Sequence, residues 1–205
     1  MVGHQASVCT RTDPPSREEG ELMEFTNREF WAVIHGLVLG TLFLLAFGGG
    51  LAGLYSLKAE FLTEEGIAER TPRLLIGSVV MAVVSWLTVL TGTFIVYPWY
   101  RAKPGAEIDA TVQSDALANF PRSWLLASEK TAEWHKLGME WKEHVAWLAP
   151  FLATAVAFAV VYYGAQLARR GEVRRAAIIF FTLAFLAAGV AGMFGAFITK
   201  AAPVS

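Results

Sequence analysis

Four long apolar segments constrain this chain more than any other feature of its sequence. They run from about Phe30 to Leu57, from Leu74 to Tyr100, from Val145 to Ala168 and from Ala176 to Thr199, and none contains an Asp, Glu, Lys or Arg. Each is longer than the roughly 20 residues that cross about 30 Å of hydrocarbon as an α-helix. The sequence therefore predicts an integral membrane protein in contact with the lipid bilayer.

The order of these segments predicts an all-α fold, a four-transmembrane-helix up-down bundle over residues 30–200. A polar arm (1–29) precedes the bundle and a short tail (201–205) follows it. Within the long loop 101–143, the chain reads as helix from about Ser128, because Trp134, Leu137, Trp141, Val145 and Leu148 recur at three- and four-residue spacing. We expect the third helix to extend beyond the membrane, with this stripe facing the bundle.

Charge in the connections predicts the orientation. Four arginines stand within the seven residues 169–175, and short loops rich in Lys and Arg stay in the cytoplasm. We therefore expect a bacterial inner-membrane protein whose N-terminus, 101–143 loop and C-terminus are periplasmic. The polar arm is expected to lie on that outer face, against other membrane subunits of a larger complex.

Composition counts against several classes of function. The net charge of −1 gives no reason to expect nucleic acid as a partner, and Cys9, the single cysteine, excludes an intrachain disulfide or a cysteine-based metal cluster. Transporters and proton pumps usually place ionisable groups near the bilayer midplane, and the four apolar segments contain none that is charged. We expect a subunit without a catalytic site of its own.

Histidines are the residues in the outer layer that could carry chemistry. His35 lies 23 residues before Lys58, and His144 lies 25 residues before Arg169. At about 1.5 Å per residue, their heights differ by about 3 Å. Tyr97 and Thr199 fall in the same layer by the same count. Helical spacing predicts that both imidazoles point into the bundle, whereas His135 falls on the opposite face and farther out.

Two inward histidines at one height are what a membrane b-type haem requires, because neutral imidazole nitrogens bind the iron from both sides. His35 and His144 are the predicted ligands, and Arg28, Arg101 or Lys142 could meet the propionates. Two alternatives stay open at this point. The histidines could be interfacial residues hydrogen-bonded to water, backbone or Tyr97, or they could form a metal site with Glu140 or Glu143.

With four spans, His35 in the first, His144 at the start of the third and aromatic residues beside both, the chain resembles the small four-helix membrane cytochrome b subunits of bacterial respiratory and photosynthetic electron-transfer complexes. The resemblance covers about residues 31–200. It implies a subunit with one haem b that passes electrons between a donor such as cytochrome c and a quinone, with Tyr97 beside the ligands or the quinone. The competing hypothesis is a purely structural subunit that braces a larger complex and binds only lipid or a similar apolar molecule.

Overall fold

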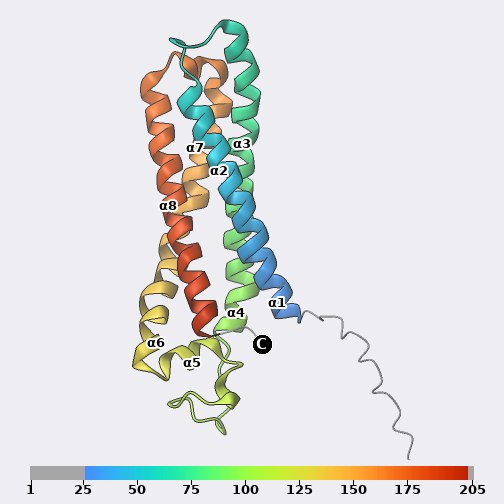
Figure 1. The fold of residues 1–205 in the computed structure, drawn as a ribbon, viewed down its shortest axis with the longest axis vertical. Helices are drawn as coiled ribbons and strands as arrows, with labels where there is room; N and C mark the ends of the chain where they lie inside the picture. Colours follow the sequence, from blue (N-terminus) through green and yellow to red (C-terminus); the bar gives the residue numbers. More distant parts are fainter. Residues whose placement is uncertain (1–25, 203–205) are drawn as a thin grey trace, which may run out of the picture.

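The computed structural model describes residues 26–202 and shows four long helices side by side in one elongated bundle (Figure 1). These helices comprise Asn27–Ser56, Glu64–Tyr100, Glu129–Ala168 and Gly171–Ala201, and all four are long and apolar enough to cross a membrane. The predicted fold class is therefore confirmed. The third helix is the longest, with 40 residues. The predicted position of the polar arm concerns residues that lie mostly outside the described part of the chain.

The four helices are built from shorter elements. The first contains α1 (Asn27–Ala32), η1 (Val33–Val38) and α2 (Leu39–Ser56), and the second contains α3 (Glu64–Thr91), η2 (Gly92–Val96) and α4 (Tyr97–Tyr100). The third contains α6 (Glu129–Glu133), η4 (Trp134–Met139), η5 (Trp141–Val145), α7 (Leu148–Tyr163) and η6 (Gly164–Ala168). The fourth is α8 (Gly171–Ala201), and the loop before the third helix holds η3 (Asp115–Leu117) and α5 (Pro121–Leu126).

Threonines define where the first two helices begin. Thr26 accepts a hydrogen bond from the backbone N–H of Glu29, and the Glu29 carboxylate accepts one from the Thr26 N–H, which completes a capping box. Thr63 likewise accepts from the Gly66 N–H at the start of α3. These bonds satisfy amide groups that have no partner within the helix, so each helix starts at a defined residue.

Each helix packs against the next, and α8 returns to α2, so the first and third helices lie diagonally across the bundle. Phe181 is fully buried, and a Cβ on Gly50 would lie 2.6 Å from its ring. Phe47 stacks on Phe185 with ring centroids 4.1 Å apart. A glycine beside a large aromatic ring lets the backbones approach closely, which is how membrane helices gain packing energy without a hydrophobic driving force between them.

The two ends of the bundle differ. At the hairpin end, the short connections 57–63 and 169–170 join the helices in pairs (Figure 1). At the loop end, residues 101–128 fold beneath the helices, where Leu125 and Met139 join a small cluster with Tyr100 and Ile198. The Trp124 indole N–H donates to the Ala201 carbonyl at 3.0 Å, which ties this loop to the end of α8.

Most of the helical irregularity lies toward the loop end. Four segments there, η1, η2, η4 and η5, are π-helical, so their N–H groups bond five residues back. Within η2, for example, the Tyr97 N–H donates to the Gly92 carbonyl. Pro98 follows at once, and a proline ring clashes with the carbonyl four residues before it. A wider turn at Gly92–Val96 relieves that clash.

Candidate functional site

Every histidine in the described part of the chain stands on a π-helical segment. His35 lies in η1, His135 in η4 and His144 in η5. Such wide turns cost helix stability and are frequent at functional sites, because they re-aim side chains that a regular helix would place elsewhere. The histidines on these turns therefore indicate a candidate site at the loop end of the bundle.

His35 faces the second helix and is held there by a hydrogen bond. Its Nδ1 lies 3.2 Å from Oγ1 of Thr91. The Thr91 hydroxyl has one proton, which it donates to the carbonyls of Leu87, at 2.7 Å, and Thr88, at 3.1 Å. When this proton goes to one of the two carbonyls, the Thr91 oxygen accepts from His35, and the corresponding tautomer carries its proton on Nδ1. In the neutral imidazole this leaves the lone pair on Nε2, the nitrogen that binds a metal or accepts a proton.

Gly92 makes room for this ring. A Cβ built on Gly92 would lie 2.7 Å from Cε1 of His35 and 3.3 Å from Nε2. No side chain fits there unless the imidazole moves. The pair Thr91–Gly92 thus fixes both the orientation and the depth of His35, and a hydroxyl that holds Nδ1 is the kind of outer contact that orients a metal-binding histidine.

Lys142 brings an amine to the same layer from the third helix. Its Nζ is an electrostatic neighbour of His35 and lies 2.7 Å from the point where a Cβ on Gly195 would stand. Among the described residues, none forms a hydrogen bond or ion pair with Lys142. His35, Gly92, Lys142 and Gly195 therefore give this layer one residue from each of the four helices.

Sequence reasoning missed the inward position of Lys142 and treated the residue only as an interfacial partner for propionates. The third apolar segment was taken to begin at Val145, so Lys142 counted as part of the loop. Charges inside a membrane bundle are rare and mark functional sites. Lys142 lies three residues before the predicted apolar segment and within the helix Glu129–Ala168. A predicted segment extended by one helical turn toward its N-terminus would have included it.

His144 does not point into the bundle, and the expectation that it does is wrong. Its side chain is 70 % exposed, and its Nδ1 lies 3.4 Å from the carboxylate of Glu140 and 3.0 Å from the carbonyl of the same residue. Leu137 and Leu148 do share a face with His144, as predicted, but both are exposed, so this is the outward face of the helix. The structure therefore does not bring His144 and His35 together. Thr199, expected in the same layer, is also exposed.

The width of the predicted stripe explains this error. Trp134, Trp141 and Val145, the other members of the stripe, do face the protein, and Trp141 donates its indole N–H to the Ala187 carbonyl at 3.1 Å. Leu137, His144 and Leu148 lie on one flank of the stripe, and this flank is turned outward. The prediction treated the flank and the centre of the stripe as one inward face.

A second polar cluster lies nearer the loop, around His135. The Tyr100 hydroxyl is 2.7 Å from Nδ1 of His135, and Arg122 donates from Nε to Nε2 at 3.4 Å. Both ring nitrogens are thereby occupied, so His135 has a structural partner on each side rather than a free lone pair. His135 does lie on the face opposite to His144, as predicted, but His144 points outward, so the opposite face is the inward one, where Tyr100 and Arg122 converge on His135 from α4 and α5.

Tyr97 and Arg101 join this cluster on the side of the second helix. Arg101 donates from Nη1 to the Tyr97 hydroxyl at 2.9 Å and also lies over the Tyr97 ring. Glu143, from η5, is an electrostatic neighbour of Tyr97. The Tyr97 and Tyr100 rings are stacked, with centroids 6.4 Å apart. Tyr97 thus connects the His135 cluster with the third helix.

The donor set fits one ligand bond to a haem from this chain. His35 offers Nε2 as a ligand atom, and the Lys142 amine and the Arg101 guanidinium are hydrogen-bond donors that could meet carboxylates. Within residues 26–202, no group of three or more His, Cys, Asp or Glu side chains is placed to hold a metal ion, so a metal site built on Glu140 or Glu143 receives no support.

The searches for similar proteins returned nothing: neither a protein-family model, nor a curated protein, nor a solved structure matches this chain.

Proposed function

We propose that this protein is a membrane subunit of an electron-transfer complex and that His35 binds a b-type haem at the loop end of the bundle. One observation carries the proposal. The His35 imidazole lies between membrane helices with its Nδ1 hydrogen-bonded to Thr91, and in the neutral tautomer that carries its proton on Nδ1 the Nε2 keeps a lone pair for a ligand. Membrane proteins rarely place polar side chains between helices without a functional reason.

Several residues at the loop end of the bundle would hold the haem, each through a different contact. Nε2 of His35 would bind the iron, and the Lys142 side chain, in its protonated form, would offset the charge of a propionate inside the bundle. Arg101 would meet a propionate nearer the surface, and Tyr97 lies beside Arg101 there. A haem supplies an iron that gains and loses one electron, so the subunit would pass electrons between a donor such as a cytochrome c and a quinone or another membrane subunit.

The exposed position of His144 changes the expected coordination. Bis-histidine ligation with His35 would require the His144 ring to leave Glu140 and turn inward. The proposal therefore names His35 as the ligand from this chain and treats His144 as a second ligand to be tested.

Absorbance spectroscopy of the purified protein tests the proposal directly. We expect a reduced-minus-oxidised spectrum with a b-type band, loss of that band in His35→Ala, and a shifted or weakened band in Thr91→Val, because the valine cannot hold Nδ1. His135→Ala is the matched control, since both of its ring nitrogens already have protein partners. A band that disappears in His144→Ala as well would establish two-histidine ligation.

Lys142 favours a second candidate, a quinone site. Nζ can donate to a quinone carbonyl, and Nε2 of His35 can accept from a quinol hydroxyl, so the pair presents both kinds of hydrogen-bonding group. In this case the protein would show no haem band but would retain a quinone through purification, and Lys142→Met would release it. If the purified protein showed neither a haem band nor a bound quinone, the structural alternative would remain, a subunit that braces a larger complex.

A further inference from the structure

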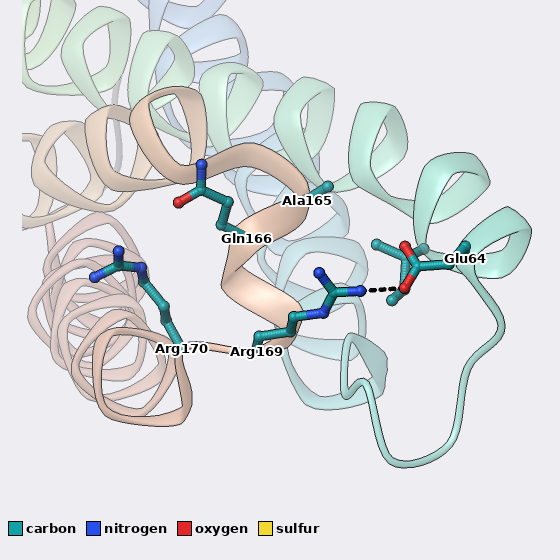
Figure 2. A pocket seen from close by; sticks show the side chains of 6 residues that line it. Glu64, Ala165, Gln166, Arg169 and Arg170 are labelled. Carbon is teal, nitrogen blue, oxygen red and sulfur yellow. Dashed lines mark hydrogen bonds and ion pairs between the residues drawn. The ribbon is translucent and has the colours of Figure 1, made fainter.

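A pocket at the hairpin end lies far from the histidines. It is formed where the first turn of α3 meets the end of the third helix, and its lining residues are Glu64, Ile67, Ala165, Gln166, Arg169 and Arg170 (Figure 2). The end of the third helix is fixed here by Arg174, which is buried and donates to the carbonyls of Leu167, at 3.0 Å, and Ala168, at 2.9 Å. The pocket therefore has a rigid wall.

The pocket carries a net positive charge. Glu64 pairs with Arg169, as Figure 2 shows, so its carboxylate is compensated within the pocket. Arg170 lies over the ring of Tyr163, with the guanidinium carbon 5.2 Å from the ring centroid. No described residue forms an ion pair with Arg170. The aromatic ring supports the guanidinium on one side and leaves its N–H donors unpaired.

An apolar surface runs from the pocket along the helix. Beside the pocket, Arg170 lies over Tyr163, whose ring packs edge-on against that of Tyr162 with centroids 4.9 Å apart. Tyr162 is 70 % exposed and Phe158 69 %, and their rings stack with centroids 6.0 Å apart. In a membrane this exposed surface faces lipid. A charged pocket joined to an apolar stripe matches a ligand with an anionic head and a long apolar tail.

We propose that this pocket binds the headgroup phosphate of an anionic phospholipid, with an acyl chain lying along Phe158 and Tyr162. Arg170 supplies the charge, because a guanidinium can donate two parallel hydrogen bonds to phosphate oxygens, and the Gln166 amide adds a neutral donor. Basic pockets between membrane helices at the membrane surface bind such headgroups. A zwitterionic lipid carries its own cation and gains less from Arg170.

Native mass spectrometry of the full chain, released from nanodiscs that contain equal amounts of phosphatidylglycerol and phosphatidylcholine with the same acyl chains, tests this. We expect the wild type to retain phosphatidylglycerol preferentially and Arg170→Gln to retain about fivefold less, the contribution of one cation near an anionic headgroup. Arg175→Gln, at an exposed arginine in the first turns of α8 outside the pocket, is the control and should retain as much as the wild type. Gln166→Leu gives a second variant should Arg170→Gln fold poorly, and it should also retain less.

Three results would overturn the proposal. Equal retention of the two lipids would show that the pocket does not select the headgroup. Equal losses in Arg175→Gln and in the pocket variants would show general attraction to the charged connection rather than a site. Displacement of the lipid by millimolar inorganic phosphate would show that the pocket binds free phosphate and that the apolar stripe contributes nothing.

Discussion

At the scale of single residues, the contact between His35 and Gly92 decides what the loop end can bind. The imidazole occupies the space that any other residue at position 92 would fill. This explains why a glycine stands in the second helix at a point where it contributes nothing to helix propensity. The same reasoning applies to Gly195, which accommodates the ammonium of Lys142.

Gly92→Ala is therefore expected to displace the His35 ring and break its bond to Thr91. A double-mutant cycle measures this. Gly92→Ala should cost more unfolding free energy in the wild type than in a His35→Ala background, with a coupling of about 1 kcal/mol, typical of residues in contact. The measurement is thermal or denaturant unfolding in a mild detergent.

Gly48→Ala provides the control, because a Cβ at Gly48 meets no atom within 4 Å. It should show no coupling to His35→Ala and a small gain in stability from the better helix propensity of alanine. Equal costs of Gly92→Ala in both backgrounds would mean that the ring does not occupy this space.

At the scale of elements, the sequence was sufficient to predict four helices but not the faces that they present. Each apolar run exceeds the membrane thickness, so helix is the only regular structure open to it unless the chain forms a closed barrel. Facing depends on which flank of an apolar stripe meets the neighbouring helices, and the spacing of apolar residues does not fix this. His144, on the outward flank, was therefore placed inward, and Lys142, two residues away, was left outside.

The candidate site was predicted in part for the same reason. His35 could be found because a histidine within an apolar run is conspicuous in the sequence. Its partner Thr91 could not be assigned, since several hydroxyls line the second helix and only the packing of η1 on α3 selects one. The His135 cluster depends on Arg122, which lies on the short helix α5, within a loop region whose path no periodicity predicts.

The contact between Arg174 and the end of the third helix predicts how a substitution changes the stability of the protein. Arg174 is buried at the start of α8, and its Nη1 donates to two carbonyls that end the third helix. Hydrogen bonds from charged donors contribute about 1.5–3 kcal/mol, and their removal leaves buried acceptors unpaired. We expect Arg174→Met to lower the free energy of unfolding by about 2–3 kcal/mol, measured by denaturation in detergent.

Arg175→Met is the matched comparison, since Arg175 is the next residue, is exposed and takes no part in this cap. It should change the stability by less than about 0.5 kcal/mol, as for most surface substitutions. Similar losses from both variants would assign the effect to the charge of the connection and remove the capping role of Arg174.

At the scale of the whole molecule, the two ends of the bundle differ in their side chains: the histidines and tyrosines of the candidate site lie at one end, and a group of arginines lies at the other. The histidine layer, the tyrosines and the folded loop 101–128 occupy the loop end, whereas the arginines of the hairpin end surround the pocket in Figure 2. Basic residues in short connections stay in the cytoplasm. We therefore propose that the hairpin end is cytoplasmic and that the candidate site opens toward the periplasm.

Cysteine labelling in intact cells tests this orientation. In a Cys9→Ser background, a cysteine at position 106, in the exposed part of the loop, should react with a membrane-impermeant maleimide from outside, whereas one at position 60, in the exposed connection between the first two helices, should react only after lysis. The wild-type Cys9 should behave like position 106, because an even number of spans places the two on the same side. The reverse pattern would place the histidine layer on the cytoplasmic side, where a periplasmic cytochrome c could not be its donor. In that case a quinone or another membrane subunit would be the remaining source of electrons for His35.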